Sequence, residues 1–127
     1  MSIASTLETV MDAGNGILGI ALMDRDGIPI AETVRAGAEG ILGQGEISTL
    51  AIEFERVLGE ADKAADAVQG GSLRETQVVM ARFSLVFARV ADGLTLVLVL
   101  EPDGNLGKAR YLIRRNLLEI RQQVGAA

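Results

Sequence analysis

Two apolar segments limit what this chain can fold into more than any other feature. Residues 17–23 are apolar apart from Gly19, residues 94–100 are apolar apart from Thr95, and turn-forming residues border both segments. Apolar runs of this length are typical of strands that are covered on both faces of a sheet. We therefore expect both segments inside one sheet that has helices on its two faces. The small residue at Gly19 predicts that another element approaches the first strand closely.

Turn signals connect these two segments to three more expected strands. The sequence Asp24-Arg25-Asp26-Gly27 predicts a hairpin after the first strand. The strand that follows contains Pro29, which cannot donate a ladder hydrogen bond and is therefore expected at a sheet edge. In the order that hairpins require, residues 75–81 form the opposite edge and have no proline to protect it. The expected strands span residues 17–23, 28–33, 75–81, 83–90 and 94–101.

Three further segments have the apolar spacing of helices. The first begins near Ile3 and ends before Gly14, and the others span about 46–69 and 106–124, after an expected glycine-rich loop at 35–45. The element order is then αββαβββα, an α+β fold with a five-stranded, mainly antiparallel sheet. The 127 residues fit a single domain. We expect the N- and C-terminal helices on one face of the sheet and the long helix on the other.

The long helix and the unprotected edge strand together predict a homodimer. The helix carries two apolar series with a spacing of seven, the pattern of helices that pack against one another. An exposed apolar strand edge is a template for pairing with another chain. We expect a symmetric dimer that continues the sheet across residues 75–81 and packs the long helix on its copy. The predicted interface residues are Ile47, Leu50, Phe54, Val57, Ala61, Ala64, Val68, Thr76, Val78 and Met80.

Composition excludes several classes of function. The chain has no cysteine and no histidine, which removes the usual zinc sites, thiol nucleophiles and Ser-His-Asp triads. The net charge of −5 argues against binding to nucleic acid or to anionic membranes. No apolar run approaches the ~20 residues of a membrane span, and the N-terminus does not resemble a signal peptide. We expect a cytoplasmic protein without a cofactor.

The remaining motifs do not assemble a catalytic or metal site. The glycines of residues 37–45 lack the lysine of a phosphate-binding loop. Asp24 and Asp26 resemble a fragment of a calcium loop, but an Asp-Gly hairpin turn accounts for them. Acidic residues of the long helix are expected on its solvated face; they are Glu53, Glu60 and Asp62. We therefore predict no catalytic, metal-binding or cofactor-binding residues.

The last helix combines positive charge with apolar residues outside its buried stripe. It carries five of the chain's 12 cations, which are Lys108, Arg110, Arg114, Arg115 and Arg121. Such a mixture of arginine, tyrosine and leucine is typical of protein contacts. The alternative is that the apolar residues pack on the first helix and that the arginines are solvated charges near the helix C-terminus, where the helix dipole favours positive charge. The candidate partner surface consists of Arg110, Tyr111, Arg114 and Leu118.

From residue 3 to about residue 124, the chain resembles the Roadblock (dynein light-chain) family. The resemblance lies in Gly16-Ile-Leu-Gly-Ile-Ala-Leu-Met-Asp-Arg-Asp-Gly27, in the Ala-Asp-Gly turn at 91–93, and in Asn-Leu-Gly-Lys-Ala-Arg at 105–110. It implies an αββαβββα fold similar to longin and profilin-like domains. It also implies a dimeric adaptor without enzyme activity, of the kind that includes dynein-associated light chains, scaffolds of Ras-like GTPases, and bacterial GTPase regulators of the MglB type.

The expected function is therefore a homodimeric binding module that engages a Ras-like small GTPase, with stimulation of GTP hydrolysis left open. No motif supports an arginine finger at Arg110 or Arg114. One alternative is a structural adaptor of a motor or signalling complex that ignores the nucleotide state. Another is a small-molecule sensor or an enzyme that uses only Asp and Glu. A pocket lined by two or more carboxylates would favour that last alternative.

Overall fold

The computed structural model of the chain describes residues 2–38, 42 and 46–125. The expected order αββαβββα is confirmed, whereas part of the glycine-rich segment predicted at 35–45 lies outside the described residues. Strand β3 ends at Val79, two residues before the predicted end, because Met80 already bonds to Phe83 across the turn. The elements are α1 (Ile3–Ala13), β1 (Ile17–Met23), β2 (Pro29–Val34), α2 (Glu46–Ala67), β3 (Glu75–Val79), β4 (Ser84–Ala91), β5 (Leu94–Leu100) and α3 (Leu106–Gln123).

The five strands form one antiparallel sheet in the order β2-β1-β5-β4-β3. The two apolar segments pair with each other at its centre, where Ile20 lies opposite Leu98. Strands β2 and β3 occupy the edges, as predicted. Pro29 opens β2 beside a bulge in the register with β1, where a missing amide donor is tolerated.

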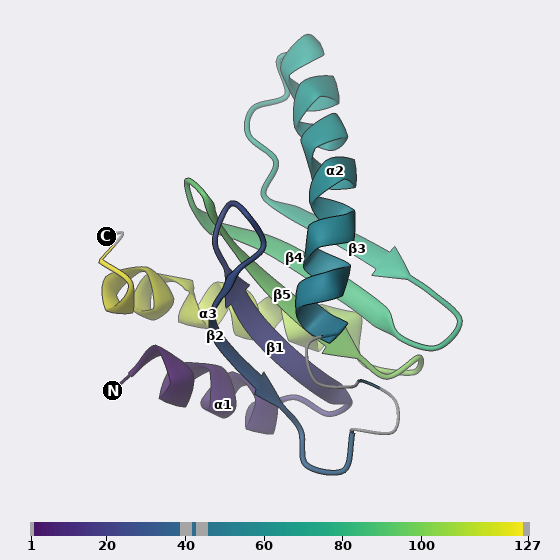
Figure 1. Cartoon of the computed structure of the whole chain (residues 1–127), viewed down its shortest axis with the longest axis vertical. Coiled ribbons are helices and arrows are strands. Elements are labelled where there is room, and N and C mark those ends of the chain that lie inside the picture. The colour runs from purple at the N-terminus through teal and green to yellow at the C-terminus, as the bar shows by residue number, and fades with distance from the viewer. Residues whose placement is uncertain (1, 39–41, 43–45, 126–127) are drawn as a thin grey trace.

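Helices cover both faces of the sheet (Figure 1). Helices α1 and α3 pack on one face, in a core that includes Leu7, Ile20 and Ile113. Helix α2 packs on the other face, over a core that includes Leu58 and Phe87. This division of the three helices agrees with the sequence-based expectation. Because neighbouring residues of a strand face opposite sides, both central strands are buried along almost their whole length.

Helix α2 approaches β1 closely at Gly19. A Cβ atom on that residue would lie 2.8 Å from Cδ1 of Ile47 and 3.0 Å from Cδ2 of Leu42. A larger residue at this position would therefore displace the ends of these two side chains and disturb the packing of α2 on β1. The close approach predicted from the small side chain is thus made by α2 and by the residue at 42 that precedes it.

The C-terminal part of α2 extends beyond the strands (Figure 1). Its three buried residues, Ile47, Ala51 and Leu58, lie in the first 13 positions of the helix. Further along, Val68 just beyond the helix keeps 77% of its surface exposed. The sheet of one chain therefore leaves the C-terminal end of this helix uncovered.

Candidate functional site

An apolar surface runs along one flank of α2 and onto the adjacent edge strand β3. We call it the α2–β3 surface. Leu50 and Phe54 join Val78 and Met80 at the border of the core, where all four are partly buried. Further along α2, Val57 is 52% exposed. The surface comprises Leu50, Phe54, Val57, Ala61, Ala64, Val68, Thr76, Val78 and Met80.

The placement of Ile47 corrects the predicted interface. This residue is fully buried against Gly19 in the core of its own chain and has no surface to offer a partner. The reason is the mismatch between a seven-residue spacing and 3.6 residues per turn, which rotates successive positions by about 20° per heptad. The series therefore starts beneath the helix at Ile47 and has turned by about 60° toward the flank when it reaches Val68.

The outer edge of β3 is open to another strand. Within the described part of the chain, β3 pairs with β4 alone, from Glu75 opposite Ala88 to Val79 opposite Ser84. Val79 is 68% exposed, and the strand contains no proline. Its backbone donors and acceptors on that side are available for pairing with a second chain.

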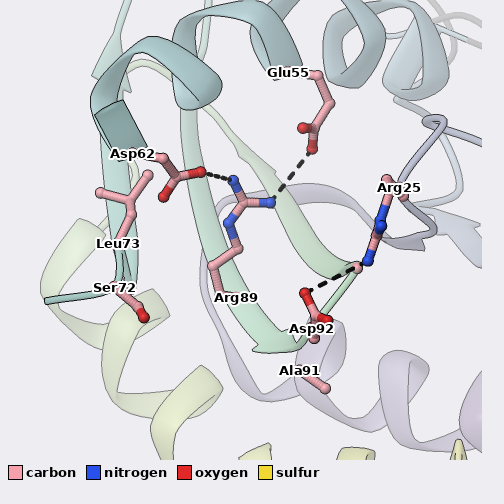
Figure 2. Close-up of a pocket in the computed structure, with 9 residues that line it drawn as sticks. Arg25, Glu55, Asp62, Ser72, Leu73, Arg89, Ala91 and Asp92 are labelled. Atoms are coloured by element: carbon pink, nitrogen blue, oxygen red, sulfur yellow. Dashed lines mark hydrogen bonds and ion pairs between the residues drawn. The ribbon is translucent and has the colours of Figure 1, made fainter. Parts of the chain in front are cut away.

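Arg89 forms the centre of a polar hollow beneath the middle of α2 (Figure 2). Its Nη2 atom lies 2.9 Å from Oδ2 of Asp62, and its Nη1 atom lies 3.6 Å from Oε1 of Glu55. Nη1 also donates to the hydroxyl of Thr95 at 2.9 Å. The hollow has a volume of about 570 Å³. Arg25 and Asp92 stand at its rim, 3.5 Å apart.

The carboxylates of this hollow are already engaged. Glu55 and Asp62 both face Arg89, so their charges hold α2 to strand β4. Asp62 is 45% exposed, and its pairing corrects the prediction that it belongs to the solvated face. Glu53 and Glu60 do lie on that face, each with a cation three residues along the helix. The main effect of these ion pairs is to hold α2 against β4.

A second surface lies on α3. Glu75 at the start of β3 accepts hydrogen bonds from Arg114 at 3.0 Å and from Arg110 at 3.1 Å. These bonds, Arg114 first, lower the pKa of the Glu75 carboxyl, although burial opposes the shift. Tyr111 and Leu118 are 56% and 63% exposed. The alternative in which they pack on α1 is therefore wrong.

Asp24 stabilises the turn of the β1–β2 hairpin. Oδ1 of Asp24 accepts from the backbone amides of Asp26 at 2.9 Å and Ile28 at 3.0 Å. Among the residues that the structure describes, no group of three or more acidic side chains is placed to hold a metal ion. In the same part of the chain, no helix is long and apolar enough to cross a membrane.

Sequence reasoning missed two features. Arg89 is the one charged residue of β4, and its position two residues after Phe87 places it on the α2 side of the sheet. From the sequence alone, this spacing indicates that Arg89 can form an ion pair with the long helix. Exposed apolar residues beside Gly27 were also missed: Ile28 and Ile30 follow it in the chain, and Ile52 of α2 lies against it in the fold. They are 60%, 49% and 54% exposed.

Comparison with known proteins identifies the fold. No protein-family model and no curated protein matches the chain. The structure is similar to that of the gliding protein MglB from Thermus thermophilus, with a TM-score of 0.84 and 19% identity over 98% of this chain and 90% of that chain. A Roadblock/LC7 domain from Streptomyces avermitilis gives 0.80 and 11%, covering 98% and 99%. MglC from Myxococcus xanthus gives 0.66 and 27%, covering 97% and 99%.

These likenesses extend over nearly the whole of each chain. They show that this chain has the fold of Roadblock/LC7 proteins, which confirms the fold that the sequence resemblance implied.

Proposed function

We propose that this chain, with its Roadblock-type fold, is a homodimeric adaptor that regulates or scaffolds a Ras-like small GTPase. The observation that carries the proposal is the continuity of the α2–β3 surface. An open strand edge and an exposed apolar helix flank adjoin each other on one side of the molecule. A single chain leaves both incomplete, and a second copy completes both at once.

Two-fold symmetry explains why one surface can satisfy both elements. In a symmetric dimer the same patch lies on each side, so every buried side chain counts twice. Fully burying a valine contributes about 1.5–3 kcal/mol, and both Val57 and Val68 are more than half exposed in the single chain. Pairing β3 with its copy adds backbone hydrogen bonds across the centre and removes one open sheet edge.

The GTPase part of the proposal rests on the sequence resemblance and on the shared fold. It assigns the chain no active site of its own. Arg110 and Arg114 are both bound to Glu75, so neither is assigned as an arginine finger. Regulation then acts through binding, by favouring one nucleotide state of the GTPase or by placing it next to another protein.

The test uses the Ras-like GTPase encoded nearest to this chain, loaded with GDP or with a non-hydrolysable GTP analogue. The proposal predicts binding that differs between the two states, measured by pull-down and calorimetry, and a changed rate of GTP turnover if the adaptor also stimulates hydrolysis. Equal binding in both states would instead support a structural adaptor that ignores the nucleotide. No binding in either state would remove the GTPase from the proposal.

The Arg89 hollow supports a second candidate function, the sensing of a small polar molecule. Glu55, Asp62 and Asp92 line the hollow, which meets the criterion of a pocket with two or more carboxylates. A ligand would have to compete for Arg89 or Arg25 and thereby loosen α2. Native mass spectrometry of the purified protein tests this candidate. A stable adduct that disappears in Arg89→Met supports it, and a spectrum of the bare chain alone counts against it.

A further inference from the structure

Helix α3 presents an apolar strip with positive charge on both sides. At 100° per residue, Tyr111 and Leu118 lie within about 20° of each other on its outward face, and both are more than half exposed. Arg110, Arg114 and Arg121 follow one border of this strip, and Lys108 and Arg115 follow the other.

A groove adjoins the first border. It has a volume of about 520 Å³ and lies between α3 and the β3–β4 pair, with Arg74, Arg114 and Arg121 among its lining residues. Glu75 is the one acid that lines it. Nε of the Arg121 guanidinium donates to the carbonyl oxygen of Val90 at 2.5 Å, which fixes this guanidinium at the groove. We call the groove and the strip together the α3 surface.

The charge of the α3 surface is opposite to that of the whole chain. Apart from Arg89, which also lines the groove but pairs with Glu55 and Asp62 of α2, the surface holds six of the 12 cations and only two of the 17 acids, Glu75 and Glu119, in a chain with net charge −5. Helix stability does not explain this distribution. Of the cations on α3, only Arg121 lies in the last turn, where the helix dipole favours positive charge, and Lys108 lies near the end where the dipole disfavours it.

Glu75 shows which chemistry the groove accepts. Arg114 holds its carboxylate through Nε and Nη2, both at 3.0 Å, and Arg110 binds it from the side. This is the two-point geometry in which arginine prefers carboxylates. Glu75 pairs with Arg110 and Arg114, whereas no ion pair among the described residues engages Arg74, Lys108, Arg115 or Arg121, so these cations are available to the carboxylates of a partner.

We propose that the α3 surface binds an acidic amphipathic segment of a partner protein, with apolar side chains on Tyr111 and Leu118 and carboxylates along the arginine border. The proposal rests on the adaptor function above and names the chemistry of one of its partners. A concave groove suits a peptide chain, whereas the flat face of a bilayer cannot enter it. The acidic net charge of the molecule also disfavours an anionic membrane or a nucleic acid.

The experiment selects peptides without assuming their sequence. A phage library of random peptides about four helical turns long is panned on the whole protein, with counter-selection on a variant that carries Arg114→Gln and Arg121→Gln. The neutral glutamines can still hydrogen-bond to Glu75 and to the backbone. The proposal predicts enriched peptides that combine Glu or Asp with Leu, Phe or Trp. Selected peptides without an acidic excess, or the absence of any that discriminate, would overturn it.

Binding of a selected peptide is then measured by fluorescence anisotropy. We expect roughly tenfold weaker binding for Arg114→Gln/Arg121→Gln and a similar loss when salt rises from about 0.1 M to 0.5 M. Lys108→Glu/Arg115→Glu repeats the test on the other border without touching Glu75, and Tyr111→Ala/Leu118→Ala tests the apolar strip. Unchanged affinity in all three variants would refute the proposal.

The matched control is Arg56→Glu, which changes the net charge by the same amount as Arg114→Gln/Arg121→Gln at an exposed position on the solvated face of α2 and should leave affinity unchanged. Sedimentation with phosphatidylcholine–phosphatidylserine vesicles forms a second arm. Sedimentation that depends on Arg114 would assign the surface to a membrane instead. These variants do not alter the α2–β3 surface, so a peptide result that fails while the dimer and GTPase binding persist rejects this inference alone.

Discussion

The ion pair between Arg89 and Asp62 predicts a measurable coupling between β4 and α2. Nη2 of Arg89 lies 2.9 Å from Oδ2 of Asp62, and the two side chains are 25% and 45% exposed, respectively. Fully exposed pairs contribute about 0.2–1 kcal/mol, whereas hydrogen bonds to charged groups contribute about 1.5–3 kcal/mol. Because this pair is partly buried, we expect a coupling free energy of about 1 kcal/mol, between these two limits.

A double-mutant cycle isolates this coupling. Arg89→Met should lower the free energy of unfolding by about 2 kcal/mol, because it also removes the contacts with Glu55 and Thr95. Asp62→Asn should cost about 1 kcal/mol, and the double variant should cost less than the sum of both. Urea unfolding followed by circular dichroism measures each value. The chain concentration is held fixed, because a dimer's stability depends on it.

The exposed pair of Lys63 and Glu60 on the same helix provides the control cycle, since both side chains are more than 70% exposed. Its coupling should not exceed about 0.5 kcal/mol. A coupling free energy of Arg89 and Asp62 below about 0.3 kcal/mol, within the error of simple additivity, would refute the conclusion that this ion pair holds α2 against β4.

Three other substitutions test the packing and the electrostatics. Gly19→Ala should destabilise the chain by about 1–3 kcal/mol, because its Cβ would meet Ile47. Gly59→Ala, whose Cβ would meet nothing within 4 Å, should stabilise α2 by up to about 1 kcal/mol. Urea unfolding measures both variants, and a change of the same sign in their free energies of unfolding would contradict this account. The pKa of Glu75 is lowered from its ordinary value of about 4.5. Its pairing therefore stabilises the fold fully at a pH above that ordinary pKa, and this stabilisation is lost as the pH falls through the lowered pKa. Glu75→Gln should therefore be less stable than the wild type at pH 7 and equally stable in acid, and a stability gap that stays constant with pH would count against the pairing.

The layers and edges of the fold could be predicted because their signals are local. Hairpin turns fix which strands are neighbours, Pro29 marks one edge, and the apolar runs mark the centre. These patterns need no knowledge of distant contacts.

The contacts of the candidate sites were harder to predict because they join distant segments. Arg89 and Asp62 are 27 residues apart, and Arg114 and Glu75 are 39 residues apart. Periodicity alone cannot indicate which charged residues will face each other after helices pack. The heptad spacing likewise did not reveal that Ile47 lies in the core, because a straight helix rotates the series away from its starting direction.

The dimer is the central claim, and the molar mass in solution tests it most directly. Light scattering coupled to size exclusion at micromolar concentration should give twice the chain mass of 13.4 kDa. Val57→Glu should shift the protein toward the single chain. Ile52→Glu should not, because it is equally exposed but lies on the other flank of α2. A wild-type mass of one chain at this concentration would contradict the account.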